Sequence, residues 1–254
     1  MERKIGAQLY TIRDHVKTDA ELEASIDKLV KIGYTFGQKS AMDHIAPEKL
    51  KEITQKTGFE FTGDHISFDS YDNIEKVILE HKIYNCMMPG VGSLPTEMRT
   101  SKEGILSFMK KANEVSDKLA TEGMTFTYHN HAFEFTKIDG KNIMDYILET
   151  ANENFKLMVD VYWLSYAGIN PVKFLRKYKD MVGGVHYKDL KIVDNAPQMC
   201  EVGEGNLDWE EICAVCDEIK PRYIYVEQDR YWTDDDPIKA LEISYNNLKK
   251  LGYK

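Results

Sequence analysis

The sequence predicts a single (β/α)8 barrel of the TIM type spanning residues 1–254. Short apolar runs alternate with segments of helical period from one end of the chain to the other, which favours a βα architecture. The length of 254 residues is usual for such a barrel, and no Pro/Ser-rich linker or charge block indicates a domain boundary. A doubly wound open sheet is the competing fold. It would normally carry a glycine-rich phosphate loop after the first strand, where this chain has QLYTIRDH.

The apolar runs place the strands in order along the chain. We expect them at residues 4–10, 34–38, 59–65, 83–88, 124–129, 156–160, 182–186 and 222–227. Helix signals lie between these runs: a capping box at Thr18 and Glu21, prolines in the first turn after Asn170 and Asp236, and glycines after helix ends at Gly33, Gly58 and Gly123. The final helix has an apolar stripe at spacings of three and four, formed by Ile238, Leu241, Tyr245, Leu248 and Leu251.

Composition disfavours several classes of protein. A formal charge of −9 opposes binding to phosphate backbones, so nucleic acid is not expected as a partner. No apolar run approaches the roughly 18 residues of a membrane span, and the N-terminus regains charge before a signal peptide can develop. We therefore expect a soluble cytoplasmic protein. Cys213 and Cys216 form a CxxC on an amphipathic helix, where buried structural thiols are expected rather than a redox or zinc pair.

Polar residues stand where most of the predicted strands end. In a parallel barrel these ends converge on one mouth, where active sites are built. Imidazole and carboxylate ligands without cysteine suit Mn²⁺, Co²⁺, Mg²⁺ or Zn²⁺. The fourth strand, which ends at Met88 and Pro89, is the exception. The strand-end residues are Gln8, Gln38, His65, His129 with Glu134 just beyond it, Asp160, His186 and Glu227.

The fifth strand offers two candidate metal ligands in the segment TYHNHAFEF. Spacing favours His129, which stands at the strand end, whereas Glu134 lies five residues further on. Charge favours Glu134, because a third carboxylate would hold the ion more tightly and free His129 or His131 to transfer protons near neutral pH. Alternatively, Asn130 and His131 only orient the ligands.

Several segments together resemble the sugar phosphate isomerase/epimerase group of xylose isomerase-like TIM barrels. Related barrels include inosose dehydratases and the sugar-isomerase-like subunits of C-glycoside deglycosidases. The resemblance runs nearly end to end, through IGAQLYTIRD, YHNHAFEF, VDVYWLSYAGINPVKFL, VHYKD, EVGEGNLDW, VEQD and SYNNLKKLG. It implies a divalent ion, often manganese, held by Glu134, Asp160, His186 and Glu227. Gln38 stands where many relatives have a glutamate, and an amide cannot act as a base.

An ion at this mouth predicts chemistry next to a sugar carbonyl. A base removes the adjacent proton, and the fate of the enediolate decides between isomerisation, epimerisation and β-elimination. The expected catalytic residues are His129, His131 and Glu227. Substrate contacts are expected from Gln8, His65, Trp163 as an aromatic wall and Lys188 as an oxyanion or phosphate ligand. Lys188 can instead pair with Asp189 or Glu204, and the glycine-flanked EVGEGNLDW segment can form a lid.

The leading interpretation is therefore a metal-dependent isomerase or epimerase acting on a small sugar or sugar derivative. A lyase or dehydratase, in some cases part of a larger enzyme, is the alternative. A phosphodiesterase like the endonuclease IV barrels would need more histidines than these strand ends offer. A non-catalytic sugar-binding subunit is a further alternative, and assembly with a partner subunit or with further copies of the chain stays open.

Overall fold

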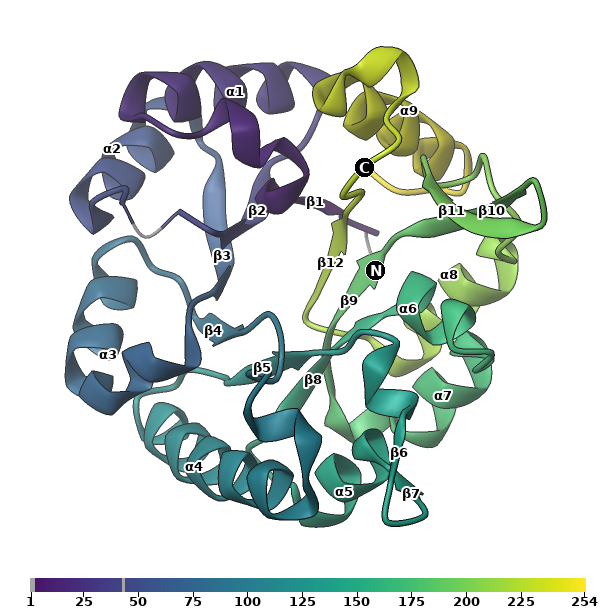
Figure 1. The fold of residues 1–254 in the computed structure, drawn as a ribbon. Coiled ribbons are helices and arrows are strands. Elements are labelled where there is room, and N and C mark those ends of the chain that lie inside the picture. Colours follow the sequence, from purple (N-terminus) through teal and green to yellow (C-terminus); the bar gives the residue numbers. More distant parts are fainter. Residues whose placement is uncertain (1–2, 43) are drawn as a thin grey trace.

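The computed structural model describes residues 3–42 and 44–254, and its central feature is a closed barrel of parallel strands. Within the described residues eight strands follow one another around the barrel in chain order, which confirms the predicted fold class. Figure 1 looks down this barrel, with the helices forming an outer ring. The barrel strands are β1 (Gly6–Gln8), β2 (Phe36–Ser40), β3 (Glu60–His65), β4 (Met88–Val91), β5 (Thr127–His129), β8 (Lys156–Asp160), β9 (Val182–Tyr187) and β12 (Tyr223–Val226).

The helices begin and end at the signals in the sequence. The Thr18 hydroxyl accepts from the backbone N–H of Glu21, Pro171 and Pro237 occupy first-turn positions, and Gly58 ends its helix with φ of 75°. The α-helices are α1 (Asp19–Ile32), α2 (Pro47–Thr57), α3 (Ile74–Ile83), α4 (Lys102–Thr121), α5 (Ile143–Thr150), α6 (Val161–Tyr166), α7 (Pro171–Lys177), α8 (Trp209–Ile219) and α9 (Pro237–Lys250). Short 3-10 helices are η1 (Leu9–His15), η2 (Phe68–Asn73), η3 (Met98–Thr100), η4 (Phe133–Phe135), η5 (Lys179–Met181) and η6 (Thr233–Asp235).

The fourth strand lies further along the chain than predicted. Residues 83–88 were expected to form it, but α3 runs to Ile83, Asn85 turns with φ of 60°, and β4 begins only at Met88. Tyr84 and Cys86 are buried, which explains why this connection has the apolar composition of a strand. Gly90 lies in β4 where a side chain would clash with the backbone of Thr127 in β5, so this strand contains a residue that usually signals a turn.

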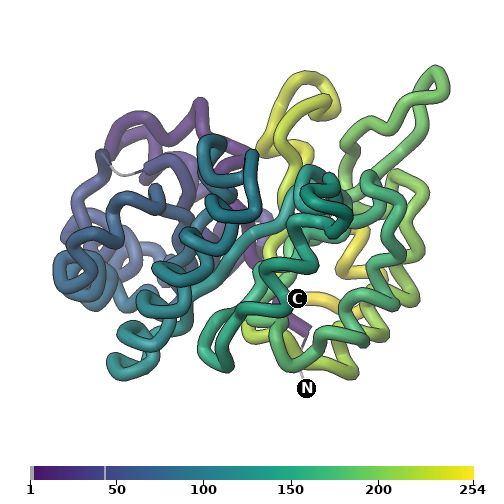
Figure 2. Tube along the Cα trace, turned by 60° about the horizontal axis from the view of Figure 1, so that its bottom comes forward, coloured from purple at the N-terminus to yellow at the C-terminus, as the bar shows by residue number. Residues whose placement is uncertain are grey.

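Two small ribbons outside the barrel were not predicted. β6 (Lys137–Ile138) pairs with β7 (Lys141–Asn142), and β10 (Asp189–Val193) pairs with β11 (Ala196–Cys200), both antiparallel. Figure 2 shows the longer ribbon, in green, projecting from the side of the molecule opposite to the two chain ends. Its turn contains Asp194 and Asn195, both at positive φ, which these short polar residues tolerate better than most.

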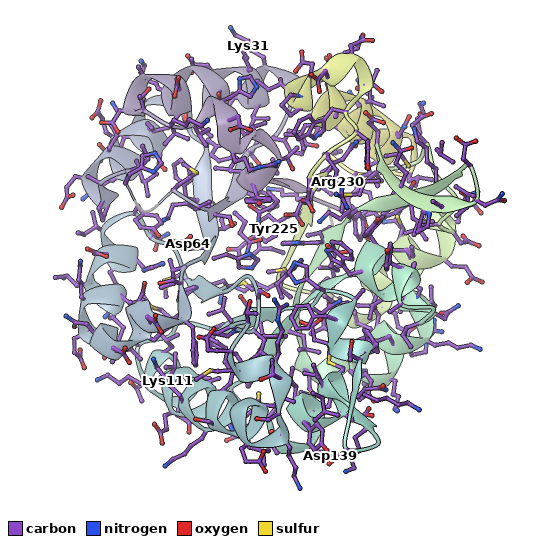
Figure 3. All side chains as sticks on the ribbon, in the orientation of Figure 1. Lys31, Asp64, Lys111, Asp139, Tyr225 and Arg230 are labelled. Atoms are coloured by element: carbon purple, nitrogen blue, oxygen red, sulfur yellow. The ribbon has the colours of Figure 1, made fainter. Side chains whose placement is uncertain are left out.

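Apolar side chains fill the interior of the barrel below its mouth. Phe36, Met88, Met158 and Tyr225 form one buried cluster, and Figure 3 shows Tyr225 near the centre of the ring of strands. A larger core lies between the strands and the helices, and it includes Cys213 and Cys216 on α8 as buried free thiols. In the part of the chain that the structure describes, none of the helices is both long and apolar enough to cross a membrane.

Candidate metal centre at the barrel mouth

Four buried residues at the carboxyl ends of consecutive barrel strands offer ligand atoms to one point. They are His129 at the end of β5, Asp160 at the end of β8, His186 in β9 and Glu227 just after β12. One ligand atom from each lies within 4.8 Å of all the others. The strand register brings them together, because Asp160 pairs with His186 and the backbone N–H of Glu227 bonds to the carbonyl of Tyr187.

Hydrogen bonds orient the two imidazoles of this group. His129 Nδ1 lies 3.1 Å from the carbonyl of Gly92, so it donates there and leaves Nε2 facing Asp160 Oδ2 at 3.3 Å. His186 Nε2 lies 2.6 Å from Gln38 Oε1, which leaves Nδ1 facing Glu227 Oε2 at 2.9 Å. In neutral rings both inward nitrogens therefore present lone pairs to carboxylate oxygens. Only a proton or a cation can stabilise that arrangement, and two imidazoles with two carboxylates are a suitable ligand set for a divalent ion.

The charges of the group are set by burial and by its neighbours. Burial lowers the pKa of His186 despite the opposing effect of Glu227. Burial also disfavours protonation of His129, but Asp160 outweighs it and raises the pKa of that ring. For Asp160 and Glu227 burial acts against ionisation, yet the ammonium of Lys188 and the neighbouring histidines hold the pKa of both carboxyls low. Two buried carboxylates are thus ionised at the mouth.

Lys188 is 1% exposed and contacts the same carboxylates. Its ammonium lies 3.0 Å from Glu227 Oε2, 3.4 Å from Asp160 Oδ2 and 3.0 Å from Asp229 Oδ2. Burial lowers the pKa of this lysine, but the three carboxylates outweigh burial and raise it. The alternative sequence-based pairing of Lys188 with Asp189 or Glu204 is not the arrangement in the structure.

Glu134, which the family resemblance implied as a ligand, lies outside the four-residue group. Its carboxylate is buried in the turn after β5, where it accepts from the Tyr128 hydroxyl at 2.6 Å and from the backbone N–H of His131 at 2.8 Å. Burial raises the pKa of Glu134 to about 7, although these hydrogen bonds oppose the shift. The strand-five residue that the structure brings to the group is His129.

Gln8 in β1 and Gln38 in β2 form hydrogen bonds that hold His186 in place. Gln8 Nε2 donates to Gln38 Oε1 at 2.7 Å, while Gln8 Oε1 accepts from the backbone N–H of Tyr10 and caps η1. The same Gln38 oxygen accepts from His186, so the amide holds this imidazole in place. Burial places the pKa of His65 well below its usual range, and its ring lies 5.4 Å from that of His129.

His131 and Trp163 continue the site outward as aromatic rings. Their centroids are 5.3 Å apart, and burial lowers the pKa of His131 to about 3, which keeps this imidazole neutral. Lys188 Nζ lies 5.5 Å from the centroid of the Trp163 ring. Asn130 does not face the group with its oxygen; instead Oδ1 accepts from the backbone N–H of Asp160 and positions that residue.

Buried polar atoms surround the group without partners among the described residues. Donors and acceptors are both represented, which is what a ligand with several hydroxyls needs. These atoms are Gln38 Nε2, His65 Nε2, Asn130 Nδ2, His131 Nδ1, Trp163 Nε1 and Asp229 Oδ1.

The segment EVGEGNLDW is held in place by Asp189, the first residue of β10. Asp189 accepts hydrogen bonds from the backbone N–H groups of Gly203 at 2.9 Å and Gly205 at 3.1 Å, and from Trp209 Nε1 at 2.6 Å. A side chain at Gly205 would clash with Asp189, which explains the glycine there. Asp208 caps α8 by accepting from the backbone N–H of Glu211.

Asp229 is the site residue that the sequence reasoning missed. It stands two positions beyond Glu227 in VEQD, a spacing that places both side chains on one side of an extended chain. Its backbone carbonyl accepts from Arg13 and its carboxylate pairs with Lys188.

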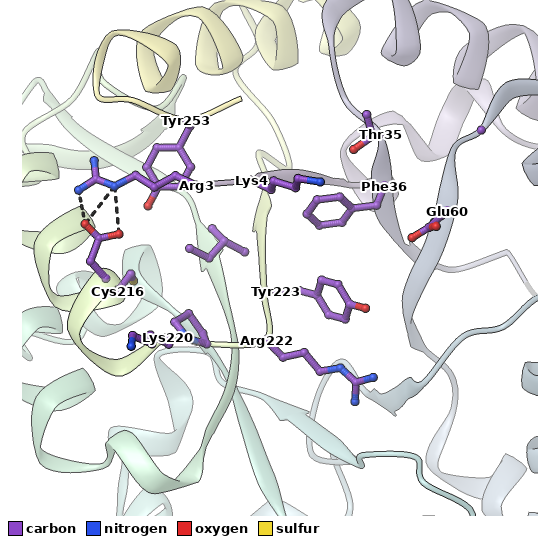
Figure 4. Close-up of a pocket in the computed structure, with 14 residues that line it drawn as sticks. Arg3, Lys4, Thr35, Phe36, Glu60, Cys216, Lys220, Arg222, Tyr223 and Tyr253 are labelled. Atoms are coloured by element: carbon purple, nitrogen blue, oxygen red, sulfur yellow. Dashed lines mark hydrogen bonds and ion pairs between the residues drawn. The ribbon is translucent and has the colours of Figure 1, made fainter. Parts of the chain in front are cut away.

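A hollow of about 1090 Å³ opens at the opposite end of the barrel. Figure 4 shows it lined by Phe36, Glu60 and Tyr223, which lie at the starts of β2, β3 and β12, and by Arg3 paired with Asp217. None of the four grouped residues lines it, so the ligand-type residues and this hollow are separate features.

A closed parallel barrel with its polar residues gathered at the carboxyl ends of the strands defines a TIM-barrel protein of the kind that builds its site at the mouth. The model of the xylose isomerase-like TIM barrel family matches residues 26–251, and the chain belongs to that family. This confirms the resemblance predicted from the sequence.

Individual relatives are more distant. An inosose dehydratase from Clostridium botulinum (strain Alaska E43 / Type E3) is 32% identical over 80 residues, a match that spans 31% of this chain and 26% of that protein. A sugar phosphate isomerase/epimerase from Parabacteroides distasonis ATCC 8503 superposes with a TM-score of 0.81 at 18% identity, covering 98% of this chain and 94% of the other. The IOLI protein, solved with a zinc atom bound, superposes with a TM-score of 0.72 at 14% identity, covering 98% and 97%. These structural likenesses concern the fold.

Proposed function

We propose that this protein is a divalent-metal-dependent isomerase or epimerase that moves a proton next to the carbonyl of a small sugar or sugar derivative. The observation that carries the proposal is the buried group of His129, Asp160, His186 and Glu227 at the mouth, surrounded by polar atoms that have no partner among the described residues. The names of the relatives, which include a sugar isomerase/epimerase and an inosose dehydratase, agree with chemistry of this kind.

We assign the metal ligands to His129, Asp160, His186 and Glu227. When bound, the ion supplies a Lewis acid that polarises the substrate carbonyl and stabilises the negative charge left after proton removal. Mn²⁺ is the ion we expect first, and Zn²⁺, Co²⁺ and Mg²⁺ also accept imidazole and carboxylate ligands. Glu134 instead maintains the turn that places His129 and His131.

Within this site the protein supplies the base and the substrate contacts. Glu227 is the proposed base, because it is a carboxylate of the group whose pKa is held low, so that it is ionised and can accept a proton. His131 is neutral and offers Nδ1 to a substrate hydroxyl, and His65 offers Nε2 in the same way. Gln8 acts through Gln38, whose free Nε2 can donate to the substrate. Trp163 provides the aromatic wall, with its indole N–H available to a hydroxyl oxygen.

Elimination is the second candidate reaction. Gln38 cannot serve as a second carboxylate base, which makes a two-base epimerisation harder for this site. Lys188 places an ammonium beside the proposed base, and a leaving hydroxyl or alkoxide needs such a cation. A dehydratase or lyase acting on a keto-sugar, keto-glycoside or inosose is therefore the alternative, alone or as a subunit of a larger enzyme.

Product analysis with metal-loaded protein tests these candidates. Ketoses, 3-keto-glycosides and inososes are each incubated with the protein loaded with Mn²⁺ or Zn²⁺, and the products are followed by NMR. An isomer or epimer supports the leading proposal, whereas an unsaturated product supports elimination. Tight metal binding without any turnover would contradict both and support a sugar-binding subunit.

A further inference from the structure

The ammonium of Lys188 contacts the two carboxylate oxygens, Glu227 Oε2 and Asp160 Oδ2, that also face the histidines of the proposed metal site. Glu227 Oε2 lies 2.9 Å from His186 Nδ1 and 3.0 Å from Lys188 Nζ. Asp160 Oδ2 lies 3.3 Å from His129 Nε2 and 3.4 Å from Lys188 Nζ. The lysine therefore stands against both carboxylates of the proposed ligand set, on oxygens that also face the two histidines.

We infer that Lys188 is a resident counter-cation of the metal centre, which competes with the divalent ion for Glu227 and Asp160 and is retained by Asp229 when the ion is bound. The inference rests on the proposed metal site. It gives the lysine a role in metal affinity that is separate from contact with a substrate.

The charge balance of the site gives the physical reason. Asp160 and Glu227 are buried carboxyl groups that both contact the Lys188 ammonium, and two buried carboxylates without a cation beside them would be costly. Lys188 compensates them while the ligand positions hold no ion. Once a divalent ion is bound, the ammonium becomes a repelling like charge at the same oxygens, so it must lower the affinity for the ion.

Asp229 can keep Lys188 paired when a metal ion takes its place beside Glu227 and Asp160. Its side chain is 22% exposed and already holds Lys188 at 3.0 Å, and its second oxygen has no partner among the described residues. It lies on the segment that follows Glu227 and is absent from the four-residue group. A carboxylate so placed can keep the lysine paired without sharing the ion.

A permanently structural ion pair is the competing explanation, and metal affinity separates the two. Full-length protein is stripped of metal, and the dissociation constants for Mn²⁺ and for Zn²⁺ are measured by calorimetry without substrate. Lys188→Met is expected to bind each ion at least tenfold more tightly than wild type. Lys173→Met, which removes an exposed lysine on α7, is the matched control and is expected to match wild type.

A double-mutant cycle tests the role of Asp229. Asp229→Asn is expected to weaken metal binding in the wild-type background and to have a clearly smaller effect in the Lys188→Met background, because Asp229 acts through the lysine. Asp235→Asn, on the same connection, controls for the loss of a negative charge. Metal affinity is the only quantity that the cycle compares. If Lys188→Met does not fold without metal, Lys188→Arg replaces it as the second background. Because arginine keeps the positive charge, Asp229→Asn is expected to weaken metal binding in the Lys188→Arg background as it does in wild type.

Equal or weaker metal binding by Lys188→Met, or an effect of Asp229→Asn that is the same with and without the lysine, overturns the inference. If Asp229→Asn does not weaken metal binding in the Lys188→Arg background, the inference is also overturned. Wild-type protein that binds neither ion overturns the proposed metal site together with the inference. Wild-type binding that Lys188→Met leaves unchanged overturns the inference alone.

Discussion

The hydrogen bonds of Glu134 and His129 decide between two candidate ligands that differ by five positions in the sequence. Both oxygens of Glu134 are engaged by Tyr128 and by the backbone at His131, whereas His129 presents Nε2 to Asp160. Charge alone favoured a third carboxylate at the ion. The turn after β5 instead uses this carboxylate to satisfy its own backbone, which sequence spacing does not reveal.

The first prediction concerns this choice. His129→Ala is expected to weaken Mn²⁺ binding by about 100-fold or more, because losing a direct ligand should cost at least as much as losing a partner of a ligand. Glu134→Gln is expected to change the affinity only a few-fold. Calorimetric titration of the two variants side by side checks this, and the opposite ranking would assign the ligand role to Glu134.

The second prediction is a pH dependence of stability at Glu134. Burial raises the pKa of this carboxyl to about 7 in the folded protein. The folded state therefore keeps a proton that the unfolded chain loses near its ordinary pKa of about 4.3, and the stability contribution falls as pH rises between these values, by roughly 4 kcal/mol in all.

Glu134→Gln resembles the neutral carboxyl and does not titrate. Urea unfolding of metal-free wild type and variant at about pH 5 and about pH 8 should show the variant gaining stability relative to wild type at the higher pH. Parallel behaviour of the two proteins would mean that Glu134 is ionised in the fold throughout this range.

Strand ends identified most of the candidate site from the sequence, because a parallel barrel carries its strand ends to one place. Asp160, His186 and Glu227 could be found in this way. The pairing of Lys188 with Asp229 could not, since it depends on the path of a connection that has no periodicity. Gln38 was noted as a departure from the resembling family, but its contact with His186 required the structure.

Among the elements, the connection from β9 to α8 differs most from expectation. The sequence suggested a lid at EVGEGNLDW, and the structure shows β10 and β11 followed by a segment tied to Asp189. The β10 residues Ile192 and Val193 are exposed, so this ribbon is not a buried apolar run of the kind from which the barrel strands were predicted. The fourth strand was misplaced for the opposite reason, because the connection before it is apolar and buried and so resembles a strand.

The third prediction tests how this segment is held. Asp189→Ala leaves backbone N–H groups and the Trp209 indole without their acceptor, and it is expected to destabilise the fold by about 3 kcal/mol. Urea unfolding measures the loss, and limited proteolysis should cut within residues 200–209. Asp194→Asn in the exposed ribbon turn should change neither, and an Asp189→Ala variant as stable as wild type would refute the tether.

At the scale of the whole molecule, the residues that stabilise the barrel and the residues of the candidate site occupy different parts of it. The apolar cluster around Tyr225 fills its interior, and the polar group stands above that cluster on the strand ends. Because the ligands come from β5, β8, β9 and the end of β12, a bound ion would connect four of the eight barrel strands.

The fourth prediction follows from this connection. Mn²⁺ at about 100 times its dissociation constant should stabilise the folded protein by about 2.7 kcal/mol and raise the melting temperature by about 5 °C or more. His129→Ala should show little of this rise. Thermal unfolding with Mn²⁺ and with excess chelator checks the effect, and equal melting temperatures under both conditions would argue against a metal site.

Solvent deuterium exchange tests most directly the proposal that this barrel moves a proton next to a carbonyl. Mn²⁺-loaded protein is incubated in D₂O with the ketoses, 3-keto-glycosides and inososes, and deuterium at the carbon beside the carbonyl is followed by NMR. We predict metal-dependent exchange with at least one of these compounds, lost in Glu227→Gln and kept in Glu210→Gln on the exposed face of α8. Bound metal without exchange, or exchange that survives Glu227→Gln, would contradict the proposed chemistry.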